Sequence, residues 1–382
     1  MSEVKTHSPM YRQILATPAA LSGSYGAMES VARSILSTPE IFRVRRIVLC
    51  GSGDSFFAAK AVEWPAAHLT GIDVVSLPSL EAARYRSTLG REQDLRSTLV
   101  VAISSSGEAA RTVEAANRFR RRGALVLAMT AAPESRLARA ASRVFSLPVP
   151  QLPAAPGYGP YLFSMVALHL LAFRLAEVRG SMTMDKAQLW RRELQVRLDE
   201  LPRVHEAVDA VCADLATRYR HLPMFEFLGS GPAAAVAQFG MAKMLEAVGT
   251  HALAQDVEEW AHLHFFTRSP HDTATVLLSP LGSGAESRAK ELLTYLERLE
   301  RPNIVVADEQ LAEAAAASGF DVIPVTTKIG ELLSPVHFSA PMAFLASHLA
   351  DLTGAEYGRG CRGPWESAAG GGAVRNSAIL GD

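Results

Sequence analysis

Gly51-Ser52-Gly53 follows the apolar run Ile47 to Cys50, and the same arrangement returns 178 positions later, where Gly229-Ser230-Gly231 follows Phe225 to Leu228. A short apolar run that ends in small, polar residues is typical of a buried strand followed by a tight turn. The chain therefore contains the same strand and turn twice.

A second pair of polar turns has the same spacing. Ser104-Ser105-Ser106-Gly107-Glu108 follows Leu99 to Ile103, and Gly282-Ser283-Gly284-Ala285-Glu286 follows Val276 to Leu278, so the first residues of the two turns are again 178 positions apart. Two unrelated coincidences would not share one offset. A repeat of this length indicates a duplicated α/β domain, because the units of a solenoid are several-fold shorter.

Composition limits the classes of partner. At 382 residues the chain is long enough for two domains, and 38 basic against 39 acidic residues give no net field that would gather nucleic acid or an anionic membrane. We expect small molecules or further copies of the chain as partners.

The cysteines Cys50, Cys212 and Cys361 are far apart, which argues against a disulfide framework or a zinc site and fits a cytoplasmic protein. The N-terminus has no signal-peptide pattern, and the most apolar helical stretch contains a histidine and an arginine, so we expect neither export nor membrane insertion.

Short apolar runs alternate with longer helical patterns from Arg45 onward, which predicts a doubly wound parallel sheet in each half of the chain. The expected strands are residues 47–50, 73–76, 99–103, 124–129 and 144–147 in the first half, and 225–228, 276–278, 304–306 and 322–325 in the second.

Five segments are expected along the chain. They are an N-terminal helical segment over residues 1–36, a first α/β domain over 37–181, bridging helices over 182–221, a second α/β domain over 222–354, and an extended C-terminal tail over 355–382. Two prolines are expected to interrupt helices: Pro18 within residues 10–36, and Pro202 between helices at 185–201 and 204–219.

The serines Ser104, Ser105 and Ser106 lie where ligands bind in a parallel sheet, beyond the carboxyl end of a strand and before a helix. Hydroxyls and unpaired backbone amides at a helix N-terminus suit a phosphate monoester. One serine alone is usually a helix cap, but three in succession favour binding. Gly53 and Ser55 lie at the neighbouring strand end, with Ser55 as the expected hydroxyl donor; this turn lacks the third glycine of a dinucleotide-binding fingerprint.

Lys243 and Glu246 are the candidate catalytic pair. They share one face of a helix among small and apolar residues, where a half-buried carboxylate beside an ammonium could remove a proton from carbon. A surface ion pair is the ordinary alternative for this spacing, and the apolar neighbours argue against it.

The stretch from Gln255 to His264 is rich in titratable groups. A metal site there is disfavoured, because His262 and His264 are two residues apart and share a face only on a strand, and no third ligand has a suitable spacing. A histidine that acts as acid or base toward sugar oxygens fits better, since its pKa lies near the working pH. A structural role remains open for either histidine, and is favoured for His264.

Together these motifs resemble the double sugar isomerase (SIS) domain family, which includes the isomerase domain of glucosamine-6-phosphate synthase and related phosphosugar isomerases, deaminases and deglycases. The resemblance covers about residues 17–352. Ser104 to Glu108 is similar to the family's phosphate loop S-x-S-G-E-T, Lys243 and Glu246 to its K-L-K-E segment, and Glu259 to His262 to its E-x-x-H segment.

The resemblance implies two tandem doubly wound domains of flavodoxin-like type. It also implies that Glu246 moves a proton between C1 and C2, that Lys243 supports it and that His262 opens the sugar ring. The residues implied to bind substrate are Gly53, Ser55, Ser104, Ser105, Ser106 and Glu259. In that family the histidine segment often reaches a neighbouring subunit, so a homodimer with shared active sites is implied, without a metal or another cofactor.

Three departures from the family pattern bear on the ligand. Ala109 replaces the last threonine of the phosphate loop, so Arg111 or Thr112 would have to compensate. The Ser-Thr-Lys stretch before the closing helix of the first domain has no counterpart, and the tail contains no lysine that could form an imine. No glutaminase domain precedes the first half, so glutamine hydrolysis is not expected.

We therefore expect a phosphosugar isomerase, or an amino-sugar-phosphate deaminase or deglycase, that works by enolisation. A sugar-phosphate sensor without catalytic activity is the alternative from another class, because binding needs only the serines. A third possibility, a substrate without phosphate, is left open by Ala109 and the altered loop before the closing helix.

Overall fold

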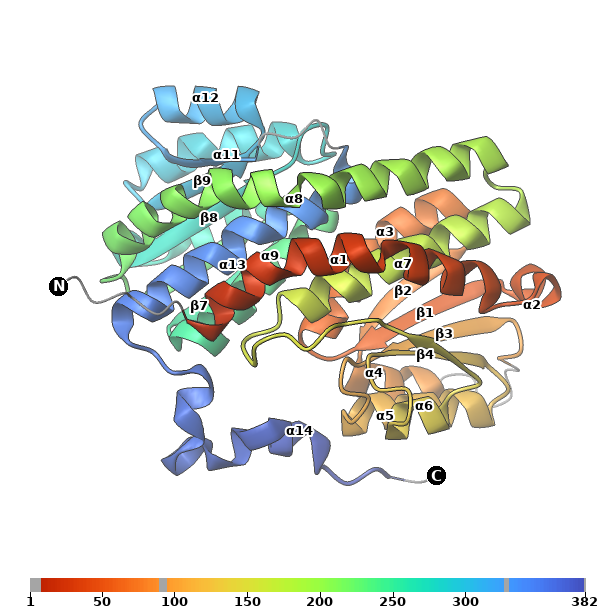
Figure 1. Ribbon diagram of the computed structural model, residues 1–382. Helices are drawn as coiled ribbons and strands as arrows, with labels where there is room; N and C mark the ends of the chain where they lie inside the picture. Colours follow the sequence, from red (N-terminus) through yellow and green to blue (C-terminus); the bar gives the residue numbers. More distant parts are fainter. Residues whose placement is uncertain (1–7, 89–94, 326–329, 381–382) are drawn as a thin grey trace. The chain divides into compact units, whose positions relative to one another are not determined.

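The computed structural model describes residues 8–88, 95–325 and 330–380 and contains two parallel sheets of five strands each (Figure 1). The first sheet has the order β2-β1-β3-β4-β5, and the second, taken from its other edge, has the order β7-β6-β8-β9-β10. The strands are β1 (Arg46–Gly51), β2 (Asp73–Pro78), β3 (Thr98–Ile103), β4 (Leu125–Thr130), β5 (Arg143–Ser146), β6 (Met224–Leu228), β7 (His251–Gln255), β8 (Thr273–Ser279), β9 (Asn303–Ala307) and β10 (Asp321–Pro324). The predicted α/β fold with two doubly wound sheets is confirmed.

The duplication extends to the register of the strands. Arg46 pairs with Asp73 in the first sheet, and Met224 pairs with His251 in the second, each residue 178 positions after its counterpart. The edge strand β7 was missed by the sequence analysis. Its five residues are exposed or half-buried and lack the β-branched pattern of an interior strand, so only the repeat could have located it.

The helices match the expected alternation. They are α1 (Pro9–Ser34), α2 (Thr38–Arg43), α3 (Asp54–Thr70), α4 (Ser79–Arg84), α5 (Ala110–Arg121), α6 (Arg136–Ala140), α7 (Gly159–Arg179), α8 (Met184–Tyr219), α9 (Pro232–Lys243), α10 (Val257–Leu263), α11 (Glu286–Arg298), α12 (Glu309–Ala317), α13 (Ser334–Thr353) and α14 (Gly372–Arg375).

The predicted breaks at Pro18 and Pro202 are wrong, because α1 and α8 run through both prolines. A proline inside a helix removes one backbone hydrogen bond at a cost of about 3 kcal/mol. Around Pro202 this cost is offset by burial of the side chains of Leu198, Leu201 and Val204.

The chain forms two compact units, each built from segments that are distant in sequence. The first-sheet unit consists of Ala20–Pro150, Pro160–Val196 and Cys361–Asp382, and the second-sheet unit consists of Met1–Ala19, Gln151–Gly159 and Arg197–Gly360. The five segment boundaries expected from the sequence stay a prediction.

Each unit has a core on the corresponding face of its sheet. In the first-sheet unit, Cys50 and Ala102 pack with Phe119 of α5 and Leu137 of α6. The second-sheet unit follows the same pattern. Its core contains Leu228 and Leu277 of the sheet, Trp260 of α10, Leu292 of α11 and Leu311 of α12. Helices therefore cover this face in both units. Because all strands of each sheet are parallel, their carboxyl ends lie at one edge.

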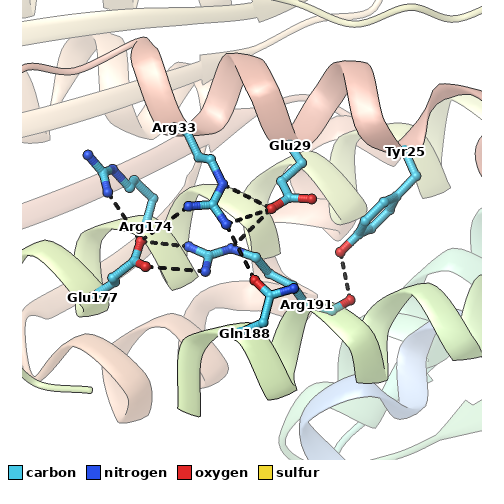
Figure 2. Close-up of polar contacts among 7 residues, drawn as sticks. All are labelled: Tyr25, Glu29, Arg33, Arg174, Glu177, Gln188 and Arg191. Carbon is cyan, nitrogen blue, oxygen red and sulfur yellow. Dashed lines mark hydrogen bonds and ion pairs between the residues drawn. The ribbon is translucent and has the colours of Figure 1, made fainter. Parts of the chain in front are cut away.

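A polar cluster in the first-sheet unit joins the helices α1, α7 and α8 (Figure 2). Arg191 of α8 is 2% exposed, and its Nη2 lies 2.8 Å from Oε2 of Glu177 on α7. Its backbone carbonyl accepts a hydrogen bond of 2.6 Å from Tyr25 of α1. Burial alone would raise the pKa of Glu177, but hydrogen bonds from Arg191 and Arg174 lower it, so the carboxylate stays ionised inside this cluster.

Helix α7 is long and apolar enough to cross a membrane, but 83% of its apolar window is buried inside the protein. The core helix of a soluble protein passes the same test, so this helix is weak evidence for a membrane span.

The C-terminal tail differs from the expected extended chain. It contains 3₁₀ turns at Tyr357–Cys361 and Gly363–Gly371 before α14. The glycines of the tail permit these turns, since several of them adopt a positive φ that other residues rarely take.

Candidate functional site

The serine loop, defined as Ser104 to Glu108, leaves β3 and precedes α5 in the first-sheet unit. Ser104 is buried, whereas Ser105 and Ser106 are half-buried. The Ser104 amide donates to the carbonyl of Met129 at 3.0 Å, and the Gly107 amide donates to the carbonyl of Ser104 at 2.9 Å.

The loop lies between β3 and α5, as predicted, since α5 begins at Ala110. Two of its amides already have protein acceptors, so these two are not the unpaired amides that the sequence suggested. The side chains of Ser105 and Ser106 are half-buried, and Oγ of Ser106 accepts from the Glu108 amide at 3.3 Å.

The shape of the loop depends on Gly107. Its φ is +65°, and a Cβ at this position would lie 1.9 Å from Oγ of Ser135, so no other residue fits. The next residue, Glu108, binds Arg136: its Oε1 accepts from the Arg136 amide at 3.0 Å and its Oε2 from Nε at 2.6 Å. The bond from the Arg136 amide is the main reason why the pKa of Glu108 is lowered. Glu108 is therefore a structural anchor of the loop.

The two residues suggested as replacements for the missing threonine have other partners. Thr112 is fully buried and its hydroxyl lies 2.8 Å from the hydroxyl of Ser79. Arg111 forms an ion pair with Glu114 and donates to the hydroxyl of Ser377 at 3.1 Å. Neither side chain thus replaces the lost hydroxyl, and Ala109 leaves the loop with its serines alone.

Gly53 and Ser55 lie at the end of β1, as predicted. Gly53 is the N-cap of α3 and has φ 54° and ψ −131°, and Gly231 is the N-cap of α9 with φ 57° and ψ −136°. The repeated Gly-Ser-Gly turn therefore has one backbone conformation in both units. Ser55 is half-buried in the first turn of α3, where the helix amides point toward the end of the sheet.

Lys243 and Glu246 lie in the second-sheet unit, where α9 changes into a π-helical turn, η2 (Met244–Val248). The Lys243 Nζ lies 2.6 Å from Oε2 of Glu246. Single π turns inside helices occur frequently at functional sites.

The two partners differ in exposure. The Lys243 side chain is fully buried and its ammonium lies 5.0 Å from the centre of the Phe239 ring, while the Glu246 side chain is 41% exposed. The reading as a solvated surface ion pair is therefore wrong for the lysine, because a buried ammonium must be paired. The carboxylate, held from inside by Lys243, remains accessible from outside.

Helix α10 carries Glu259 and His262, both exposed. Its N-terminus is capped by Asp256, whose Oδ1 accepts from the amides of Glu258 at 2.8 Å and Glu259 at 3.4 Å. In the adjoining 3₁₀ turn, Nδ1 of His264 lies 3.2 Å from Oε1 of Glu226, which gives His264 a structural partner. Within the described ranges, no group of three histidine, cysteine or acidic side chains could hold a metal ion.

A buried ionic cluster behind α10 was not anticipated from the sequence. Glu226 of β6 is 1% exposed, forms an ion pair with Arg301 and accepts from Nε1 of Trp260 at 2.7 Å. Arg301 also donates to the hydroxyl of Thr275 at 3.0 Å. A charged residue in the middle of an apolar strand was the available signal, since buried charges require partners. This cluster fixes the orientation of α10.

The second-sheet counterpart of the serine loop is shifted relative to the sequence repeat. Cys50 pairs with Ala102 and Leu228 pairs with Leu277, so the offset is 178 between the first strands but 175 between the third strands. The pairing of Ser104 with Gly282 is therefore wrong by three residues.

With the corrected offset, Gly107 corresponds to Gly282, and both have a positive φ, of 65° and 68°. The donors that follow Gly282 contact the side chain of Glu331. The hydroxyl of Ser283 donates to its Oε1 at 3.2 Å, and the Gly284 amide donates to its Oε2 at 3.4 Å. A carboxylate of the chain itself occupies the donors of this loop.

The predicted residues thus fall into two groups. Gly53, Ser55 and the serine loop belong to the first-sheet unit, and Lys243, Glu246, Glu259 and His262 belong to the second-sheet unit. Within its unit, each group lies where the sequence predicted, after the strands of the sheet or on the helix that follows.

Comparison with known families agrees with this geometry. Residues 40–174, which include the serine loop, match the SIS domain family. Residues 40–174 thus form a SIS domain. The resemblance predicted from the serine loop and the lysine–glutamate segment is confirmed, and the strand order of the first sheet is repeated in the second-sheet unit.

Among curated proteins, the chain is 27% identical over 324 residues to the glutamine–fructose-6-phosphate aminotransferase (isomerizing) of Mycolicibacterium paratuberculosis, an alignment that covers 84% of this chain and 50% of that protein. The chain thus spans about half the length of the curated relatives it matches.

Two solved structures show the same fold. The C-terminal domain of glucosamine-fructose-6-phosphate aminotransferase from Francisella tularensis has a TM-score of 0.80 at 20% identity, with coverage of 94% of this chain and 99% of the other. Glucosamine-6-phosphate deaminase from Thermotoga maritima has a TM-score of 0.70 at 18% identity, with coverage of 91% and 96%. The chain shares their α/β architecture.

Proposed function

We propose that this SIS protein is an enzyme that moves a proton between C1 and C2 of a phosphorylated sugar, either as an aldose–ketose isomerase or as an amino-sugar-phosphate deaminase or deglycase. The observation that carries the proposal is the 2.6 Å contact between the buried ammonium of Lys243 and the accessible carboxylate of Glu246. The names of the relatives, an isomerizing aminotransferase and a glucosamine-6-phosphate deaminase, support the same class of reaction.

Glu246 is the proposed base. A carboxylate that removes the C2 proton of an open-chain aldose leaves an enediolate; a proton then passes from O2 to O1, and return of the carbon-bound proton to C1 gives the ketose. Lys243 holds the carboxylate in one orientation through the contact described above, so less orientational freedom is lost when the substrate reacts. With an amino sugar, the same enolisation precedes loss of nitrogen.

The serine loop is proposed to bind the phosphate group. Ser105 and Ser106 offer half-buried hydroxyls, and Ser55 lies in the first turn of α3 at the neighbouring strand end. Hydrogen bonds to an ionised oxygen are among the stronger ones in proteins, so these neutral donors suffice for a phosphate monoester. The corresponding loop after β8 already contacts Glu331, which favours phosphate binding by the first loop only.

His262 is proposed to open the sugar ring, and Glu259, one turn earlier on α10, to contact the substrate. Both side chains are exposed in the single chain, which fits the proposal that α10 completes an active site in a homodimer. Analytical ultracentrifugation tests this assembly: a dimer at micromolar concentration supports shared sites, and a monomer contradicts them. We place the reaction in the cytoplasm, as the cysteine pattern suggests.

Proton NMR in heavy water tests the proposed reaction. The purified protein is incubated with hexose and amino-hexose 6-phosphates, and loss of the C1 or C2 proton signal is followed. Exchange with one member of the panel supports enolisation and names the substrate class. Saturable binding without exchange across the panel would contradict the enzyme and favour a sugar-phosphate sensor, and binding of the free sugars alone would contradict the phosphate assignment.

A further inference from the structure

Arg359, in the 3₁₀ turn that follows α13, contacts the end of the π turn that carries Glu246. Its Nη2 donates to the carbonyl of Glu246 at 3.1 Å and to that of Ala247 at 3.4 Å, and its Nη1 donates to the carbonyl of Val248 at 3.0 Å. One guanidinium thus binds three successive carbonyls, including that of the proposed base itself.

The position of these carbonyls makes the contact strong. The last carbonyls of a helix have no partner within the helix and carry the negative end of its dipole, so a cation there is favourable. The turn ends at Gly249, a C-cap in the left-handed conformation with φ 82°. A Cβ at Gly249 would lie 2.7 Å from Cζ of Arg359, so a glycine is needed for the guanidinium to approach.

The backbone around Arg359 is held in an unfavourable conformation. Its φ is +54°, a region that non-glycine residues rarely adopt, and the glycines on either side, Gly358 and Gly360, also have positive φ. Such a conformation persists only where surrounding contacts maintain it. The three bonds to the π turn are contacts of this kind, so the tail and the turn restrain each other.

We propose that Arg359 is a positioning residue for Glu246. The guanidinium holds the carbonyl end of the π turn, while Lys243 holds the carboxylate at 2.6 Å, and the base is thereby restrained at both its backbone and its side chain. This inference rests on the proposed function, in which Glu246 moves the proton. It gives a role to a residue of the tail, which the sequence alone had indicated only to be extended chain.

The kinetic test replaces Arg359 by alanine and by lysine. Arg359→Ala is expected to lower kcat for proton exchange about tenfold to a hundredfold, because small displacements of a catalytic group have effects of this size. KM is expected to stay within about twofold, since the serine loop is untouched. Arg359→Lys keeps a charge but not the fork of donors and should recover part of kcat, and added guanidinium ion at about 50 mM should partly rescue Arg359→Ala.

Arg362→Ala is the matched control, because it removes an arginine from the same tail. Its kcat is expected to equal that of the unaltered protein. Hydrogen–deuterium exchange gives a readout independent of activity: amides of residues 246–250 should exchange faster in Arg359→Ala and normally in Arg362→Ala.

The outcomes separate the two proposals. The role of Arg359 is refuted if the unaltered protein is active and Arg359→Ala has an unchanged kcat. It is also refuted if amides of residues 246–250 exchange at an unchanged rate in Arg359→Ala. In both cases the proposed enzyme activity stands. A fall in kcat that neither lysine nor guanidinium relieves, together with a lowered melting temperature, refutes positioning in favour of general stability. An unaltered protein that exchanges no proton from any sugar phosphate refutes the proposed function, and the role of Arg359 with it.

Discussion

The loop after β3 and the loop after β8 occupy the same place in two copies of one fold, yet their donors have different partners. The first loop has three serines, and the half-buried hydroxyls of Ser105 and Ser106 lie at its surface. In the second, Ser283 and Gly284 donate to the carboxylate of Glu331. Duplication preserved the turn, but in the second copy its donors contact a carboxylate of the chain itself.

The helices that follow the repeated Gly-Ser-Gly turns also differ, and here the candidate catalytic residues lie in the second-sheet unit. Helix α3 continues in α geometry to Thr70, and the residues 178 positions before Lys243 and Glu246 are Pro65 and His68. Helix α9 carries the buried lysine and changes into the π turn with Glu246. The two copies of one fold therefore carry different polar groups: the serine loop lies in the first-sheet unit, and the buried lysine with its accessible carboxylate lies in the second-sheet unit.

The largest expected effect comes from the π turn. Glu246→Gln should lower proton exchange by about a thousandfold or more, because the amide cannot accept the proton, while ligand affinity stays nearly unchanged. NMR exchange rates and calorimetric titration measure the two quantities. The control His68→Gln alters the corresponding position of α3 and should leave the rate unchanged. Residual turnover near the original rate in Glu246→Gln would show that the base is elsewhere.

The serine loop gives the next largest effect. Ser106→Ala should weaken binding of a phosphorylated ligand by about ten- to a hundredfold, the value of a hydrogen bond to a charged group, and should change binding of the free sugar little. Ser283→Ala, in the loop of the second-sheet unit, should not alter affinity for the phosphorylated ligand. Equal losses for both ligands, or equal effects of both substitutions, would break the assignment of phosphate to one loop.

Helices α7 and α13 correspond to each other in the two units, and a histidine in α7 is expected to make the unfolding free energy depend on pH. Burial lowers the pKa of His169 in α7 to about 3, and neither ring nitrogen has a hydrogen-bond partner among the described residues. Prolines Pro160 and Pro335 occupy the second position of α7 and α13, and with the same spacing Phe344 corresponds to His169. Below a pH of about 6.5 the unfolded chain binds a proton on this histidine that the folded chain does not, so stability falls as the pH is lowered toward 3.

His169→Phe should therefore remove part of the acid lability. We expect the loss of unfolding free energy between about pH 7.5 and pH 5 to shrink by about 2 kcal/mol, as measured by urea denaturation. The exposed His221→Phe substitution serves as the control and should leave the pH dependence unchanged. An unaltered slope in His169→Phe would mean that this histidine does not resist protonation in the folded state.

The smallest effect concerns Glu331. Glu331→Ala removes the acceptor of Ser283 and Gly284, so the unfolding free energy should fall by about 1 kcal/mol or less, and amides of residues 282–285 should exchange faster. Glu313→Ala, on the exposed face of α12, is the control. If amides of residues 282–285 exchange at an unchanged rate in Glu331→Ala, Glu331 does not hold this loop, and the contrast between the two loops is refuted.

Much of the fold and of the candidate site could be predicted because their signals are local. Alternating apolar runs located nine of the strands within a few residues, and the Gly-Ser-Gly turns marked the strand ends where Ser55 and the serine loop lie. The spacing of Lys243 and Glu246 placed both on one helix face. Strand β7 was missed because its half-buried side chains carry no strong period.

The sequence by itself determined the duplicated α/β fold, the edge of each sheet where polar turns gather, and the candidate residues at those turns. These follow from steric and hydrophobic preferences that act over a few neighbouring residues. Only the tertiary structure decided that Lys243 is fully buried, that Glu331 occupies the donors of the second loop, that α8 continues through Pro202 and that Arg359 holds the π turn. Each of these depends on burial or on contacts between segments far apart in the chain, and no local pattern encodes which distant groups will meet.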